Sequence, residues 1–122
     1  MSRYSDPVTE AITYLDTQHD GVSTFGQVPA TRPARFRVVT RTGTEWLNPG
    51  NRLAQLTFEC WNTRGTAAAD DDGELLSDML AEWEAIPAAD GWVGGPYQQV
   101  DPDTGCPRSV ITILIMQHVK QK

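Results

Sequence analysis

Two cysteines and two histidines are the residues of this chain best suited to nucleophilic or metal chemistry: Cys60, Cys106, His19 and His118. A nucleophile needs a neighbouring base and an orienting acid, and a zinc site needs clustered Cys or His ligands. None of the four residues belongs to such a cluster in the sequence. Cys60 falls on the apolar face of an expected strand, which favours a buried, space-filling thiol, whereas Cys106 falls in a turn as an exposed, inert thiol. The sequence therefore predicts a protein that is not an enzyme and holds no metal.

The acidic run at residues 70–74 (DDDGE) raises the question of a calcium site. Calcium loops take their ligands from alternating positions, which consecutive carboxylates do not supply, so we interpret the run as the solvated beginning of a helix. Residues 101–105 (DPDTG) are interpreted as a turn. Gly94 and Gly95 lack the spacing and the Lys-Ser/Thr pair of a phosphate-binding loop. We expect no cofactor.

Charge is distributed unevenly along the chain, whose formal net charge is -6. Residues 32–64 contain six arginines and two acids, whereas residues 70–90 contain eight acids and no Lys or Arg. This asymmetry fits two solvated faces of a monomer. It fits equally well a molecule with a positive and a negative side that packs head to tail with copies of itself, a contact that closes into a ring when the rotation permits.

The arginines of one expected strand are candidate contact residues. Arg35, Arg37 and Arg41 lie along a segment in which Phe36 and Val38 alternate with them, so we expect the arginines to point away from the core. A solvated strand face is the equally weighted alternative to an interface.

Four tryptophans are many for a chain of 122 residues. Trp83 is expected in the core, whereas Trp46 in a loop and Trp61 on the polar face of a strand are candidate contact anchors. The complete set of candidate subunit or partner contacts is Arg35, Arg37, Arg41, Trp46, Trp61, Asp70, Asp71, Asp72, Asp78 and Glu82.

Hydrophobic periodicity predicts the elements of the first half of the chain. A helix begins at Pro7 with Asp6 as its N-cap, and Gly21 is a natural stop. Its apolar stripe is Val8, Ala11, Ile12 and Leu15. The following segments are a short strand at 22–28, a half-buried strand at 35–42, a long hairpin loop at 43–51 and a strand at 54–61.

The second half predicts a helix between residues 66 and 86, with its firm start near Asp72 because Gly73 costs about 1 kcal/mol in a helix interior. Asp71 and Glu74 form a possible capping box, and Pro87 ends the helix. The buried stripe of this helix is Leu76, Met79, Leu80 and Trp83. A strand at 97–100 and a last strand at 108–119 follow, and the last strand is apolar on both faces, as expected in mid-sheet with cover on both sides.

These elements predict a single α+β domain over residues 1–122, with a mixed, mostly antiparallel sheet and two flanking helices. A 13.5 kDa chain with 39% hydrophobic residues forms a core without disulfides. No run of about 18 apolar residues predicts a membrane span, and the N-terminus lacks an apolar signal core. Acidity over the whole chain argues against bulk binding of nucleic acid.

Three segments in this order and spacing resemble a known family. They are residues 28–43 (VPATRPARFRVVTRTG), 56–61 (LTFECW) and 101–108 (DPDTGCPR), the last of which leads into a closing strand. They resemble the small tail terminator proteins of long, non-contractile-tailed bacteriophages (siphophages), especially those of actinobacterial hosts. The likeness covers the chain from about Val8 to Val119 and rests on strands and turns, without a catalytic signature.

The resemblance implies a mixed α/β fold and a structural virion protein of the tail and neck, assembled in the host cytoplasm. It implies a homo-oligomer, a hexameric ring, that caps the tube of the major tail tube protein and meets the head-tail connector or head-closure protein. Genome DNA passes through such a ring without sequence-specific binding, and no membrane is involved. A head-closure or adaptor protein of the same neck is the first alternative, and a small-molecule-binding α+β domain is the second.

Overall fold

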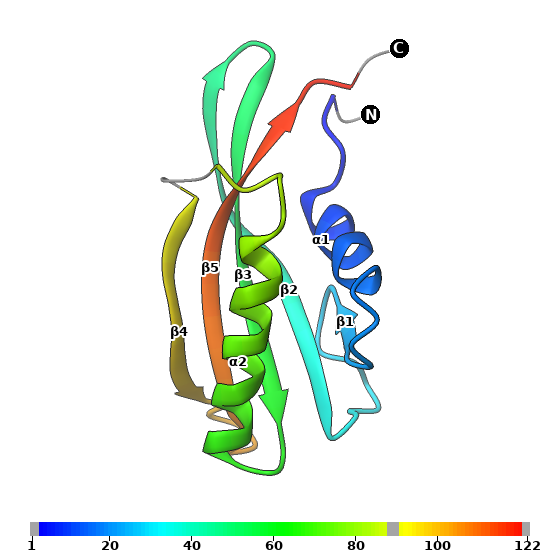
Figure 1. Ribbon diagram of the computed structural model, residues 1–122, viewed down its shortest axis with the longest axis vertical. Helices are drawn as coiled ribbons and strands as arrows, with labels where there is room; N and C mark the ends of the chain where they lie inside the picture. Colours follow the sequence, from blue (N-terminus) through cyan, green and yellow to red (C-terminus); the bar gives the residue numbers. More distant parts are fainter. Residues whose placement is uncertain (1–2, 88–90, 121–122) are drawn as a thin grey trace.

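The chain forms one five-stranded sheet with two helices packed on the same face (Figure 1). We describe a computed structural model, in which residues 3–87 and 91–120 are placed. In chain order the elements are α1 (Pro7–Asp16), β1 (Ser23–Phe25), β2 (Arg35–Asn48), β3 (Asn51–Asn62), α2 (Thr66–Ala81), β4 (Trp92–Val100) and β5 (Pro107–His118). The strand order is β1-β2-β3-β5-β4, with β1 and β2 parallel and the other neighbours antiparallel. The predicted α+β class with a mixed, mostly antiparallel sheet is confirmed.

Helix α1 has the beginning that the sequence predicts. Asp6 is the N-cap, and its side chain accepts a hydrogen bond from the backbone N–H of Val8 at 3.1 Å. Pro7 occupies the first turn, where a missing N–H leaves no bond unmade. Ala11 and Leu15 of the predicted stripe are buried in the core.

The loop predicted at residues 43–51 is wrong, because β2 and β3 continue through it as a long hairpin closed by Pro49 and Gly50. The pairing shifts register between Arg41 and Gly43 and again between Trp46 and Asn48. Such bulges break the strict alternation of side chains by which a strand is recognised in a sequence. The tip of the hairpin extends past both helices, at the end of the molecule where the two termini also lie (Figure 1).

Helix α2 begins at Thr66, six residues before the expected start, and the predicted capping box at its beginning is absent. Its N-cap is Gly65, which makes no side-chain capping bond. Gly73 lies inside the helix because of its contact with the sheet: a Cβ there would lie 2.2 Å from Ser109 Oγ and 2.8 Å from Ser109 Cβ. The glycine therefore allows α2 to approach β5 more closely than any other residue would.

The main core lies between the two helices and the sheet. Its fully buried side chains come from α1, α2 and the three central strands: Ala11, Leu15, Val39, Ala54, Leu56, Phe58, Leu76, Leu80, Ile111, Ile113 and Ile115. Tyr14 of α1 stacks on Trp83, just after α2, with ring centroids 5.0 Å apart, and its hydroxyl donates to the Met79 carbonyl at 2.5 Å. The two helices therefore contact each other as well as the sheet.

Strand β5 lies in mid-sheet as predicted, but the expected cover on both faces is wrong. Helix α2 packs over β5, and Ile111, Ile113 and Ile115 belong to the core cluster that both helices share. On the opposite face Val110 is buried, whereas Leu114 and Met116 remain half-buried, and no helix in the described residues covers these two. One face of the sheet is therefore left open along its centre.

We predict that Gly73→Ala destabilises the protein although alanine is the better helix former. The new methyl group would overlap Ser109, and overpacking of this kind costs about 1–3 kcal/mol. Urea unfolding of the purified protein measures the effect, with the exposed Glu74→Ala as the control. Gly73→Ala/Ser109→Gly should recover part of the loss, and a double variant no more stable than Gly73→Ala would contradict the contact.

Candidate interaction surfaces

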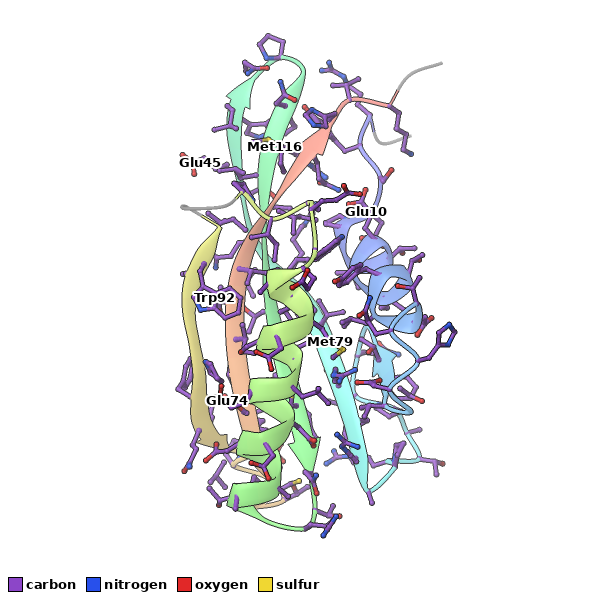
Figure 2. All side chains as sticks on the ribbon, in the orientation of Figure 1. Glu10, Glu45, Glu74, Met79, Trp92 and Met116 are labelled. Carbon is purple, nitrogen blue, oxygen red and sulfur yellow. The ribbon has the colours of Figure 1, made fainter. Side chains whose placement is uncertain are left out.

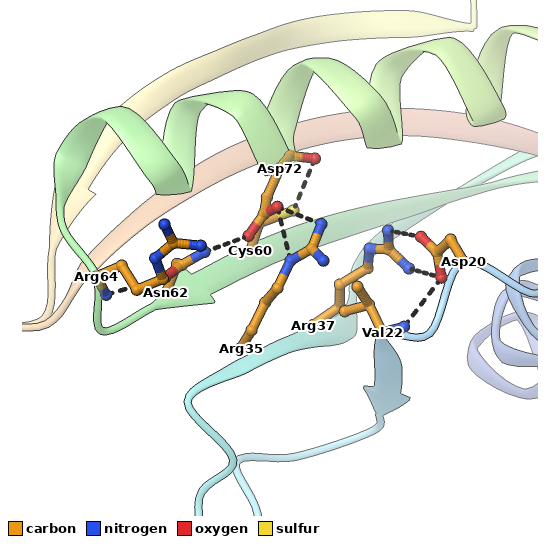
Figure 3. Close-up of polar contacts among 8 residues, drawn as sticks. All are labelled: Asp20, Val22, Arg35, Arg37, Cys60, Asn62, Arg64 and Asp72. Atoms are coloured by element: carbon orange, nitrogen blue, oxygen red, sulfur yellow. Dashed lines mark hydrogen bonds and ion pairs between the residues drawn. The ribbon is translucent and has the colours of Figure 1, made fainter.

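The prediction that the arginine side chains of β2 point away from the core is wrong for Arg35 and Arg37. Arg35 and Arg37 lie on the face of β2 that carries Val39, the face covered by the helices, and Arg37 is only 1% exposed. Arg37 forms a salt bridge with Asp20, and Asp20 also accepts from the backbone N–H of Val22 at 3.1 Å (Figure 3). Arg37 is therefore neutralised within its own subunit and is removed from the set of contact residues.

Asp72 is likewise an internal residue and not a surface acid. It is 6% exposed, and its carboxylate accepts from Arg35 Nε at 2.8 Å and from Asn62 Nδ2 at 2.9 Å (Figure 3). Arg35 Nη2 lies 2.5 Å from the same carboxylate. This network joins α2 to β2 and β3, so Arg35 and Asp72 stabilise the docking of the helix.

The prediction that Trp61 is a contact anchor is also wrong, because its side chain is only 2% exposed and does not reach a partner. Its ring stacks on Phe36 with centroids 5.3 Å apart, on the sheet face opposite the helices. The guanidinium carbons of Arg32 and Arg108 lie 5.4 and 5.1 Å from the ring centroid. Trp61 does lie on the strand face that the sequence predicted. On that face, however, it is buried in a small second apolar cluster with Phe36 and Val38.

The two thiols are placed differently by the structure. Cys60 is buried as predicted, and burial raises the pKa of its thiol to about 12, so it is not a thiolate at neutral pH. Cys106 is half-buried beside the Trp61 cluster, so the expectation of an exposed thiol is wrong. Within the described residues, no three His, Cys, Asp or Glu side chains are grouped so as to hold a metal ion.

Four carboxylates form an exposed row along α2, which we name the acidic stripe: Asp71, Glu74, Asp78 and Glu82. Their spacing of three and four residues places them on one side of the helix, and Figure 2 labels Glu74 there. No Lys or Arg of the described residues lies within salt-bridge distance of the stripe. Asp70, beside the stripe, accepts from Gln98 Nε2 at 2.5 Å.

Large exposed apolar side chains gather at two places. Trp46 is 63% exposed and, with Leu47, lies in the hairpin. The other place is the edge strand β4, where the exposed residues are Trp92, Val93, Tyr97 and Val100. Trp46 was predicted from the sequence as a contact residue, whereas the β4 group was not, although apolar residues flank Gly94 and Gly95 in the sequence. Figure 2 labels Trp92 of this group.

The outer edge of β2 also lacks a described partner strand, except where the short strand β1 pairs with it. β1 pairs with β2 at Phe36, Arg37 and Val38, and no described strand pairs with the outer side of β2 from Thr40 to Asn48. Unpaired strand edges present rows of N–H and C=O groups that pair readily with another chain. The sheet thus has one free edge on each side.

An open groove of about 930 Å³ lies between α1 and the chain that follows α2. Tyr14, Trp83 and Ala85 are among its lining residues. Gln117, also in the lining, is already bonded to the Ser5 carbonyl at 2.8 Å.

No protein-family model matches the chain, and no curated protein matches it significantly. No described helix is long and apolar enough to cross a membrane.

We predict that Asp20→Asn lowers the free energy of unfolding by on the order of 3 kcal/mol, because it leaves the Arg37 charge buried without a counterion. Denaturant titration at pH 7 measures the loss, with the exposed Asp16→Asn as the matched control. Adding Arg37→Met to Asp20→Asn should restore stability in part. Additive losses in the double variant would show that the two residues do not interact.

The same pair sets a pH dependence. Burial opposes the ionisation of Asp20, but hydrogen bonds from Arg37 and from the Val22 N–H outweigh it, so the pKa of Asp20 lies below its ordinary value of 3.8. The stabilisation is complete above the pKa of the unfolded chain and is lost as pH falls through the folded value. We therefore expect the stability difference between wild type and Asp20→Asn to narrow below about pH 4. A constant difference from pH 7 to 3, measured by urea unfolding, would contradict this origin.

Proposed function

We propose that this protein is a tail terminator: a structural virion protein that forms a ring on a phage tail tube, stops tube polymerisation and joins the tail to the head connector. The observation that carries the proposal is a single sheet with two unlike free edges, one on β4 and one on β2. The resemblance of the sequence to siphophage tail terminators supports the same conclusion.

The directions of the strands favour head-to-tail assembly. Each neighbouring pair in the series β2, β3, β5 and β4 is antiparallel, so β2 and β4 run in opposite directions. A second copy in the same orientation would bring its β4 antiparallel against the free edge of β2 and extend the sheet. This contact would shield the exposed apolar side chains of β4 from water. Because the two edges differ, the contact is heterologous and closes into a ring, of six copies by the resemblance.

The two rims of such a ring are unlike, and this explains how binding alone ends a tube. A tube is an open stack in which every added ring offers the surface that its predecessor offered. A terminator occupies the last surface, that of the major tail tube protein, without presenting a new copy of it. Its other rim meets the head connector or head-closure protein, and genome DNA passes through without sequence-specific contact. This work is binding and involves no catalysis or cofactor.

The residues available for these contacts follow from their exposure. Trp46 of the hairpin is the most exposed tryptophan, and Arg41 is an exposed arginine that forms no ion pair with any described residue. The acidic stripe supplies carboxylates that no described cation neutralises. Exposed charge pairs contribute about 0–1 kcal/mol each, so in this proposal the sheet edges supply the affinity and the charges supply the orientation.

We predict that phage carrying Val93→Lys/Val100→Lys have tails longer than wild type that are not joined to filled heads, as in a deletion of the gene. Both side chains are exposed, so the fold should persist, while lysines on an edge strand oppose its pairing with another strand. Circular dichroism checks the fold, and electron microscopy of lysates measures tail length.

Thr13→Lys/Gln18→Lys is the matched control, because it adds the same charge at exposed residues on and just after α1, outside the strands whose edges are free. This variant should give tails of normal length. If deletion of the protein instead gave tails of normal length and heads that leak DNA, the head-closure function would replace the one proposed. Longer tails on deletion together with normal assembly of the lysine variant would keep the function and reject the β4 contact.

A further inference from the structure

Arg52 of β3 is a buried cation without a carboxylate partner. Arg52 pairs with Trp46 near the tip of the hairpin, and it is 6% exposed. Its guanidinium carbon lies 4.2 Å from the ring centroid of Tyr4 and 5.6 Å from that of Trp46, and its Nε donates to Gln117 Oε1 at 2.8 Å. In the parts of the chain that are described, no carboxylate oxygen comes within 4.0 Å of this guanidinium. Buried charges in proteins are ordinarily paired, so the missing counterion needs an explanation.

A cavity of about 470 Å³ adjoins this arginine, and two further cations line it. Its lining residues are Tyr4, Ser5, Asp6, Pro7, Arg41, Arg52 and Lys120. Arg41 and Lys120 are exposed and come from β2 and from the segment after β5, so three separate strands of the sheet lead cations to one place.

The acid in the cavity does not neutralise these cations. Asp6 is engaged as the cap of α1, where its two carboxylate oxygens accept from the Val8 N–H at 3.1 Å and the Thr9 hydroxyl at 3.0 Å. Glu10 is the nearest acid by hydrogen bonding, and it reaches Arg52 only through Gln117. The lining residues together carry two more positive charges than negative ones.

We propose that this cavity is a binding site for a phosphate group. A phosphate monoester carries about -1.5 to -2 charges at neutral pH, which matches the excess charge of the lining. The fork of an arginine binds two phosphate oxygens at once, and a lysine adds a mobile point charge. Arg52 is already oriented by its stack on Tyr4 and its bond to Gln117, so its terminal N–H groups need no reorganisation to receive the anion. All residues of the site belong to one chain, so the site does not require the proposed ring, although Arg41 also lies on the free edge of β2.

The test is a titration of the full-length protein with inorganic phosphate at constant ionic strength, followed by NMR at the Arg52 Nε–H. We expect a saturable shift of this resonance and a phosphate-dependent rise in the unfolding temperature. In Arg41→Gln/Lys120→Gln the affinity for phosphate should fall roughly tenfold or more, because two charge-assisted contacts are lost. Arg32→Gln/Arg64→Gln removes the same charge from exposed residues outside the cavity and should bind phosphate as wild type does.

A competition experiment with DNA identifies the source of the phosphate group. A short DNA duplex that displaces inorganic phosphate and shifts the same resonance assigns the site to a nucleic-acid backbone; a duplex without effect assigns it to a free phosphate compound. The absence of a saturable shift, or equal binding by both double variants, overturns the proposal. So does a shift that follows protein concentration in phosphate-free buffer, because carboxylates of a second copy would then occupy the cavity. Arg52→Lys retains the charge without the fork, and it serves as the second variant if Arg41→Gln/Lys120→Gln does not fold.

Discussion

The close docking of α2 on the sheet at Asp72 and Gly73 is the contact on which the rest of the structure depends. Gly73 brings the helix axis near β5, where any side chain would overlap Ser109. The preceding residue turns its carboxylate toward Arg35 and Asn62 and ties the same turn to β2 and β3. Steric fit and ion pairing thus act at neighbouring residues, and together they set the position of the helix that covers the main core.

The arginines on the helix-covered face of β2 form ion pairs with the segments that pack on that face. An apolar side chain at Arg37 would add to the core, but the arginine instead reaches Asp20 in the segment after α1. The helix-covered face of β2 therefore binds the segments of both helices: Arg35 pairs with Asp72 of α2, and Arg37 pairs with Asp20 after α1. Buried ion pairs add little net stability over apolar packing, but they tolerate few alternative arrangements, and here they define how both helices meet the sheet.

Placing both helices on one face has a consequence for function. The opposite face has a small cluster around Trp61, and its centre remains open around Leu114 and Met116. The edges at β2 and β4 are free. The hairpin extends past the helices (Figure 1) and carries the exposed side chains of Trp46 and Leu47. The surfaces that such a subunit leaves available for contact lie on its strands. This supports assembly through the sheet rather than through the helices.

Local patterns in the sequence determined much of the fold: the cap and stripe of α1, the buried stripe of α2, the mid-sheet position of β5 and the α+β class. The positions of the charged side chains depended on tertiary structure, because alternation along a strand distinguishes two faces but does not say which face the helices will cover. Arg37 was assigned to the surface for that reason, and Asp72 because it belongs to an acidic run; their counterions lie 17 and 37 residues away in the chain. Gly73 looked like a helix boundary because a propensity scale does not include Ser109, which the fold brings against it. The cations of the Arg52 cavity come from β2, β3 and the segment after β5, and only the arrangement of these strands in one sheet brought them together.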